Sequence, residues 1–289
     1  MGESYHNYTP TEMENALVRY MSNQVLISQT TKSGDILRTA KIIVHVVLKL
    51  HLPIKLSFYN MGIHSAVRPS FEPQYDAESD KPYIDEALAS RNVSEREFLD
   101  TINEAIRLFT ENMSGNDIRR KQYELLKDEL YLSQLNIELF LQKRKWSFDE
   151  HNSLIQLVAK LLVELPDNRG YEEFTQDLFT CTSLISASSY FLQKNEHIYK
   201  NISQLLLDAL AYLDALNTKY HRIAGYEELF ISCTQHLLDT KKQALSASIF
   251  KFEETLKSSN MDDTNNKKVL SEAYKKAYPI ITNMLIEND

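Results

Sequence analysis

The chain has 289 residues, 43% of them hydrophobic and 25% charged, and a formal net charge of −8 at pH 7. This composition is typical of a folded globular protein and excludes a wholly disordered chain. The negative charge argues against non-specific binding to duplex DNA, so duplex DNA is not an expected partner. With only six glycines and seven prolines there are few turn residues, and the predicted fold class is mainly α: a multi-helix bundle or short helical array of about nine helices.

The first predicted helix begins in the sequence TPTE. Thr9 has the position of an N-cap, Pro10 that of the first helical residue, and Glu12 that of the acid that completes a capping box. Apolar residues follow at helical spacing, so we expect the helix to run to about Gln29.

A block from Ile36 to Phe71 contains no aspartate or glutamate. As a helix from about Asp35 to His51, ended by Pro53, it would be apolar apart from one stripe of cationic side chains. Its apolar residues also alternate as in a strand, which keeps a small β element near residues 41–58 as the alternative. We favour the helix, followed by an extended segment at 54–59, and the helix is too short and too charged to span a membrane. The stripe consists of Arg38, Lys41, His45 and Lys49.

A proline-rich segment at residues 60–82 is the predicted linker between two regions of the chain. We expect an N-terminal helical region at 1–75 that includes the acid-free block, and a larger α-helical region at 76–289. Within the larger region, the apolar pattern predicts one long helix from Asn116 to Trp146 and a last helix from Asn265 to Asp289.

Two segments of the larger region are similar in sequence. GYEEF from Gly170 and GYEEL from Gly225 are each followed by a cysteine, which would fit two helical-repeat-like units. Chance similarity between two amphipathic helix starts explains the pattern equally well.

The sequence contains no motif that predicts a cofactor or a metal. The six glycines are too far apart for a phosphate loop, and the eight histidines occur singly. Cys181 and Cys233 are interpreted as free buried thiols of a reducing compartment. Because the first residues also lack a secretory signal, the expected location is cytoplasmic.

One spacing suggests catalysis. Arg38 and His45 are separated by six residues in RTAKIIVH, which resembles the arginine–histidine signature of HEPN-type ribonucleases. Thr39 follows the arginine where that family usually has asparagine. The resemblance implies an α-helical enzyme that cleaves RNA with Arg38 and His45.

The acid-free block therefore allows several functions. Its cations pair with the chain's own acids in the reading we favour, because the rest of the chain has an excess of negative charge. Alternatively they form a patch for an anionic lipid or other anionic ligand. The leading functional prediction is a non-enzymatic adaptor or regulatory protein that binds a protein or peptide partner through a helical groove. The oligomeric state does not follow from the sequence. The patch would comprise Arg38, Lys41, Lys49 and Lys55.

Overall fold

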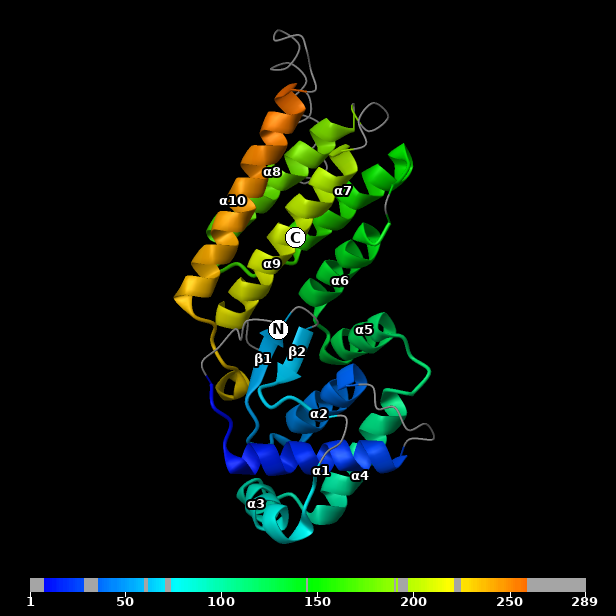
Figure 1. Cartoon of the computed structure of the whole chain (residues 1–289), viewed down its shortest axis with the longest axis vertical. Coiled ribbons are helices and arrows are strands. Elements are labelled where there is room, and N and C mark those ends of the chain that lie inside the picture. Colours follow the sequence, from blue (N-terminus) through cyan, green and yellow to red (C-terminus); the bar gives the residue numbers. More distant parts are fainter. Residues whose placement is uncertain are drawn as a thin grey trace. The chain divides into compact units, whose positions relative to one another are not determined.

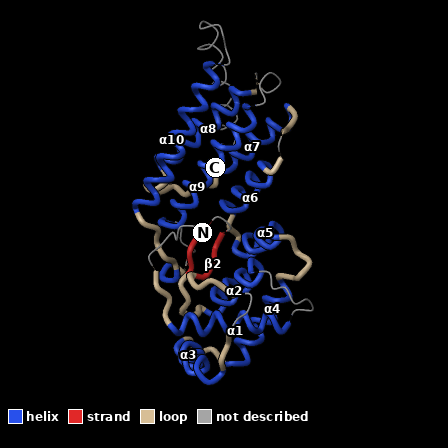
Figure 2. The backbone as a smooth tube through the Cα atoms, in the orientation of Figure 1, coloured by secondary structure: helices blue, strands red, loops and turns tan. Residues whose placement is uncertain are grey.

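The computed structural model describes residues 8–28, 36–59, 62–70, 74–143, 145–189, 191, 197–220 and 225–258. These residues form ten α-helices, a short 3-10 helix and one antiparallel pair of strands, which confirms the mainly α class with a small β element (Figure 2). The chain folds into two compact units, residues 1–127 with 217–234 and residues 128–216 with 235–289. Residue 75, the expected boundary, lies within the first unit.

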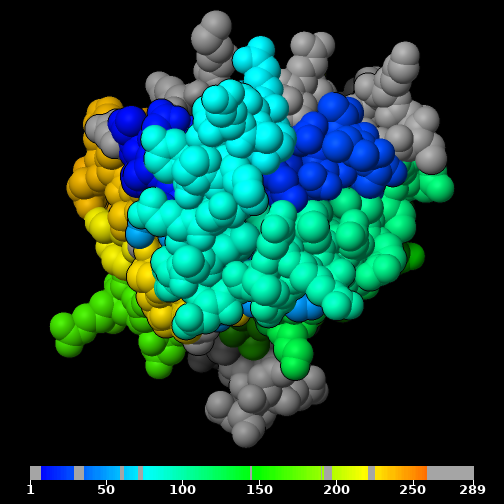
Figure 3. Space-filling model, turned by 90° about the horizontal axis from the view of Figure 1, so that it is seen from below, coloured from blue at the N-terminus to red at the C-terminus, as the bar shows by residue number. Residues whose placement is uncertain are grey.

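The first unit contains five helices, both strands and the 3-10 helix. Figure 1 shows α1 crossing close to α2 and α3, and Figure 3 shows α3 lying over the middle of α1. Its elements are α1 (Glu12–Ser28), α2 (Ile36–Leu50), β1 (Leu56–Tyr59), β2 (Gly62–Ser65), α3 (Ala77–Ser90), α4 (Glu95–Leu108), α5 (Gly115–Leu126) and the 3-10 helix η1 (Glu227–Leu229).

Helix α2 is the centre of this unit. Ile42, Ile43 and Val44 are fully buried, although successive residues point about 100° apart around the helix. A helix that is apolar nearly all round is stable only where neighbours cover it, and α1, β2, α4 and α5 all contact α2. The helical interpretation of the acid-free block is therefore confirmed, and the extended segment after it becomes β1.

The two strands form a hairpin with a close approach at its turn. Leu56 lies opposite Ser65 in the antiparallel register. Gly62 has φ +90, and a Cβ atom there would lie 2.1 Å from the hydroxyl oxygen of Tyr123, so glycine is required on both counts. The segment after η1 extends this sheet, since the backbone N–H of Ile231 donates to the Leu56 carbonyl at 2.8 Å.

Helix α1 is capped two residues later than predicted. The hydroxyl of Thr11 accepts from the Glu14 backbone N–H at 3.2 Å, and a Glu14 carboxylate oxygen accepts from the Thr11 N–H at 2.8 Å. The prediction of Thr9 and Glu12 as the capping pair is wrong, because Glu14 is also held by the Lys55 backbone N–H at 2.8 Å. This long-range contact determines which threonine caps the start of the helix.

Two further boundaries differ from the predictions. The expected long helix from Asn116 to Trp146 is two helices, because Lys127 adopts a left-handed conformation with φ +54 and Asp128 caps a new helix by accepting from the Tyr131 N–H. The expected linker at 60–82 contains β2 and the first turns of α3. Asp76 caps α3, and Pro82 lies inside it.

The second unit consists of helices only, in the part of it that the structure describes. The helices lie side by side around one apolar core (Figure 1). They are α6 (Glu129–Leu141), α7 (Phe148–Val163), α8 (Glu172–Ser188), α9 (His197–Tyr220, whose last residues belong to the first unit) and α10 (Gln235–Ser258). The core includes Ile137, Val158, Leu178, Leu213 and Leu245, one from each helix.

The two similar segments have different structures. The segment from Gly170 leads directly into α8, whereas the one from Gly225 forms η1 and then a non-helical stretch before α10 begins at Gln235. The last predicted helix, from Asn265 to Asp289, lies outside the described residues.

Candidate functional site

Arg38 and Lys41 are the cations nearest the N-terminal end of α2. Both side chains point into the first unit. Arg38 is 3% exposed, and its Nε donates to the main-chain carbonyl of Phe109. Lys41 is fully buried, with Nζ 2.8 Å from the Ile63 carbonyl oxygen and 3.3 Å from Nε2 of His64. These two side chains therefore contribute to no exposed patch.

Burial lowers the pKa of Lys41. The pKa is well below that of an ordinary lysine, first because burial penalises the charged form and second because the Arg119 guanidinium is nearby. The amine donates a hydrogen bond to the Ile63 carbonyl.

The cations near the end of α2 have local partners. Lys49 pairs with the carboxylate of Glu104, and the hydrogen bond from Lys49 is the main cause that lowers the pKa of Glu104. Lys55 donates from Nζ to the main-chain carbonyl of Glu228. Of the four residues proposed as a patch, each has a contact within the first unit.

The pair suggested by the ribonuclease signature meets at one phenylalanine. The His45 ring lies edge-on to Phe109 with centroids 6.2 Å apart, and Arg38 bonds to the carbonyl of the same residue. Burial lowers the pKa of His45, an effect that Glu104 opposes and Lys49 reinforces. Arg38 therefore lies in the interior, where its guanidinium donates a hydrogen bond to the main-chain carbonyl of Phe109.

Two shallow clefts border the end of α2. They have volumes of about 400 and 510 Å³, and both are lined by Lys49, Leu50 and Glu97. Both cationic and carboxylate side chains line each cleft, so the charge of the lining does not select one class of ligand.

A third pocket, of about 320 Å³, has a more uniform chemistry. It lies between one face of α1 and residues 67, 68, 70 and 74, which follow β2 in the chain. Hydrogen-bond donors and two apolar side chains form its walls, and no carboxylate is among the lining residues. We call it the Arg19–Arg68 pocket. It is lined by Asn15, Val18, Arg19, Ser22, Val67, Arg68, Ser70 and Gln74.

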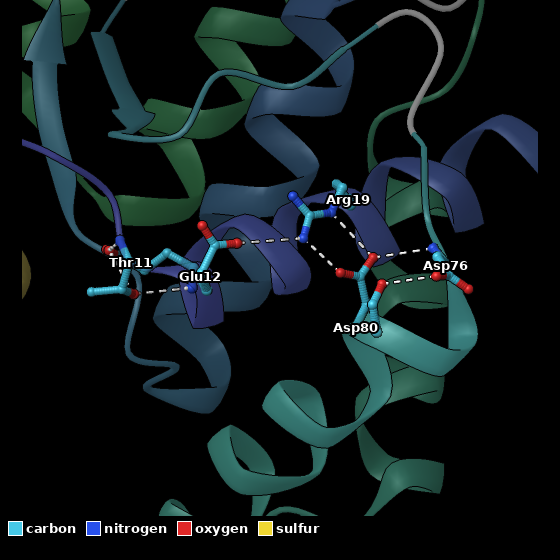
Figure 4. Close-up of polar contacts among 7 residues, drawn as sticks. Thr11, Glu12, Arg19, Asp76 and Asp80 are labelled. Atoms are coloured by element: carbon cyan, nitrogen blue, oxygen red, sulfur yellow. Dashed lines mark hydrogen bonds and ion pairs between the residues drawn. The ribbon is translucent and has the colours of Figure 1, made fainter.

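Arg19 is held at this pocket by a buried carboxylate. Its Nη2 and Nε lie 2.6 and 3.1 Å from the two oxygens of Asp80, which is 2% exposed (Figure 4). Burial alone would raise the pKa of Asp80, but the hydrogen bonds from Arg19 and from the Asp76 N–H and the guanidinium charge hold it below its ordinary value. Figure 4 also shows the Arg19 guanidinium facing Glu12, at 4.0 Å.

Two other side chains at the pocket differ in their exposure. Ser22 is 3% exposed, and its Oγ has no hydrogen-bond partner among the described residues. Arg68 is exposed and has neither an ion pair nor a side-chain hydrogen bond in the part of the chain that the structure describes. Of these two side chains, Arg68 is the one that a ligand can reach, because the Ser22 Oγ is inaccessible to solvent.

Only part of this site was predictable from the sequence. Arg68 belongs to the acid-free block, but it was not among the residues expected to bind. Asn15, Arg19 and Ser22 recur at helical spacing, i, i+4 and i+7, which marks one polar face of α1. The pocket also needs Val67, Arg68, Ser70 and Gln74 to lie near this face, and no local sequence signal predicts that approach.

No model of a protein family matches the chain, and no curated protein or solved structure matches it either. Among the described residues, no helix combines the length and apolar character needed to cross a membrane. The same residues contain no group of three or more His, Cys, Asp or Glu side chains placed to hold a metal ion.

Proposed function

We propose that this chain is a non-enzymatic binding protein whose first unit takes an anionic group of a protein or peptide partner into the Arg19–Arg68 pocket. One observation carries the proposal: the exposed guanidinium of Arg68, which has no ion pair or side-chain hydrogen bond among the described residues, lies at a pocket with no carboxylate among its lining residues.

The lining residues suit an anion. Arginine remains charged at all physiological pH values and offers up to five N–H donors in a planar fork that fits oxyanions. Arg19, held in place by Asp80, presents an already ordered guanidinium beside Arg68. An ordered donor loses less conformational entropy on binding than a mobile one.

The contacts of the other cations in the acid-free block support the choice of Arg68 as the ligand-binding residue. Arg38, Lys41, Lys49 and Lys55 each contact carbonyls or carboxylates of the first unit. Among the described residues of the block, Arg68 is the arginine or lysine for which the structure shows no such contact. RNA cleavage by Arg38 and His45 has no comparable support, because Arg38 is buried.

A peptide series tests this function. The probes are three pentapeptides of alanine and glycine with a central glutamate, phosphoserine or lysine, each titrated into the full chain and followed by amide chemical shifts. We expect saturable shifts near Ser22 and Arg68 with an anionic peptide and none with the lysine peptide.

Matched variants locate the binding. Arg68→Ala should weaken it about tenfold or more, since hydrogen bonds to charged groups contribute about 1.5–3 kcal/mol. Arg96→Ala is the control, because Arg96 is 93% exposed, lies in the same unit and makes only a long contact of 3.8 Å to Asp100. Binding that is absent from the unmodified chain, or that Arg68→Ala leaves unchanged, would overturn the proposal.

A further inference from the structure

His151 is a buried histidine near the start of α7 that makes a hydrogen bond with each of its ring nitrogens. The side chain is fully buried, and α7 packs against both α6 and α8 in the second unit (Figure 1). The indole Nε1–H of Trp146, in the segment before α7, donates to Nδ1 of His151 at 3.2 Å. Nε2 of His151 lies 2.8 Å from the main-chain carbonyl oxygen of Ile185, in the last turn of α8. One imidazole therefore joins the segment before α7 to the end of α8.

The two partners determine the protonation state of this ring. An indole N–H can only donate, so Nδ1 must be unprotonated, and a carbonyl can only accept, so Nε2 must have the proton. The neutral Nε2–H tautomer satisfies both bonds. The imidazolium has a second N–H at Nδ1, which would face the indole N–H of Trp146. A charged His151 is therefore incompatible with the bond to Trp146.

The Ile185 carbonyl depends on donors from outside the α8 backbone. It is one of the last four carbonyls of the helix, which have no regular intrahelical N–H partner. The N–H of Ser189 bonds to the Ser186 carbonyl instead. Ile185 accepts from His151 and from the Ser188 hydroxyl at 2.6 Å. The neutral ring thus also caps the end of α8.

The surroundings of the ring oppose a charge on His151. Burial lowers the pKa of His151, and the hydrogen bond with the Ile185 carbonyl raises it by a smaller amount. Among the described residues, no charged side chain contributes to this shift. On the side of α6, the ring of Phe140 lies edge-on to Trp146 with centroids 5.4 Å apart. The neutral form is therefore the one that this packing favours.

The titratable groups of the neighbouring elements have other roles. Burial raises the pKa of the Cys181 thiol of α8, so the thiol is neutral. The Tyr199 hydroxyl of α9 donates to a main-chain carbonyl at 3.2 Å. Glu150 of α7 pairs with Lys143, and the hydrogen bond from Lys143 is the main cause that lowers the pKa of Glu150. His151 is therefore the group of this cluster that a fall in pH from 7.5 to 4.5 charges.

We propose that Trp146, His151 and the Ile185 carbonyl form an acid-sensitive switch in the second unit, in which protonation of His151 releases the Trp146 indole. The closed form has a lowered histidine pKa, while in the open form the ring returns to the ordinary value of about 6.5. The open form therefore binds the proton more tightly and gains population as the pH falls. The ratio of open to closed form should rise by up to about tenfold for each pH unit below 6.5.

The test uses the full chain with Trp146, its single tryptophan, as the reporter. Trp146 is 5% exposed, so its fluorescence should be that of a buried indole at pH 7.5. The emission should shift reversibly to longer wavelength as the pH falls to 4.5, with a midpoint below about 6.5. Far-ultraviolet circular dichroism should stay constant over this range, because the helices remain folded. Emission that does not change, or that changes only together with a loss of helical signal, would overturn the switch.

Variants and one direct measurement assign the proton to His151. His151→Gln cannot be charged and retains a neutral N–H donor for the Ile185 carbonyl, so its emission should not change with pH. His236→Gln is the matched control, because His236 is exposed on α10 of the same unit, and it should titrate as the unmodified chain does. The ring nitrogen chemical shifts of His151 in the unmodified chain need no variant and should show protonated Nε2 and unprotonated Nδ1 at pH 7.5. A proton on Nδ1 at pH 7.5, or the same acid transition in His151→Gln, would overturn the proposal.

Discussion

The amine of Lys41 lies 2.8 Å from the main-chain carbonyl oxygen of Ile63, in the interior of the first unit. The bond joins α2 to β2 and satisfies a strand carbonyl from a side chain. A cation of the acid-free block is thus part of the packing between two elements, where its charge is a cost.

This contact makes a prediction about pH. An unfolded lysine has a pKa of about 10.4, and burial lowers the pKa of Lys41 in the folded chain. Between the two values the unfolded state binds a proton that the folded state does not. The free energy of unfolding should therefore rise with pH in this window by about 1.4 kcal/mol per pH unit from Lys41, and level off above the unfolded pKa.

Lys41→Met should remove this dependence. Urea unfolding at pH 7, 8 and 9, followed by circular dichroism, should show a flatter pH profile for the variant than for the unmodified chain. Lys127→Met, at an exposed position of the same unit, is the control and should preserve the original slope. Parallel profiles for the unmodified chain and Lys41→Met would show that Lys41 is protonated when folded.

The ion pair between Arg19 and Asp80 should stabilise the contact of α1 with α3. Asp80→Asn leaves the partly buried guanidinium without its carboxylate, and we expect a loss of about 1–3 kcal/mol, below the range for fully buried pairs because the Arg19 side chain is 34% exposed. Asp85→Asn on the same helix is the control. It breaks an exposed pair with Lys81 and should cost less than about 0.5 kcal/mol.

The pH dependence of the Asp80 pair has the opposite sign to that of Lys41. The folded pKa of Asp80 is lowered, so its stabilisation is present above the unfolded pKa of about 3.9 and is lost as the pH falls through the folded value. The difference in unfolding free energy between the unmodified chain and Asp80→Asn should shrink below pH 4. A difference that stays constant down to pH 2 would contradict the ion pair.

The helix of the acid-free block was predictable because two local signals agree. Arg38, Lys41, His45 and Lys49 recur every three or four residues, and Pro53 follows the expected end. No local signal indicates whether this cationic stripe faces solvent or the interior. Whether Lys41 faces solvent or the Ile63 carbonyl depends on where β2 lies, and that is a tertiary contact.

The missed boundaries have the same cause. Lys127 breaks the predicted long helix without glycine or proline, and its left-handed conformation is visible only in the structure. The Arg19–Arg68 pocket requires α1 and the segment after β2 to meet, although they are far apart in the chain. Local patterns thus predicted the class and the central helix, while the site depended on approaches between distant segments.

The start of α1 offers a direct test of such a long-range effect. The sequence pattern made Thr9 the cap, but the structure uses Thr11, because Glu14 is shared between the Thr11 N–H and the backbone N–H of Lys55. Thr11→Ala should destabilise the first unit by about 1 kcal/mol through the lost cap, and Thr9→Ala should change its stability by less than about 0.5 kcal/mol. Thermal unfolding of the two variants under the same conditions measures the contrast. A larger loss of stability from Thr9→Ala than from Thr11→Ala would show that Thr9 is the N-cap, as the local pattern predicted. It would also contradict the role of Glu14 in joining α1 to the segment before β1.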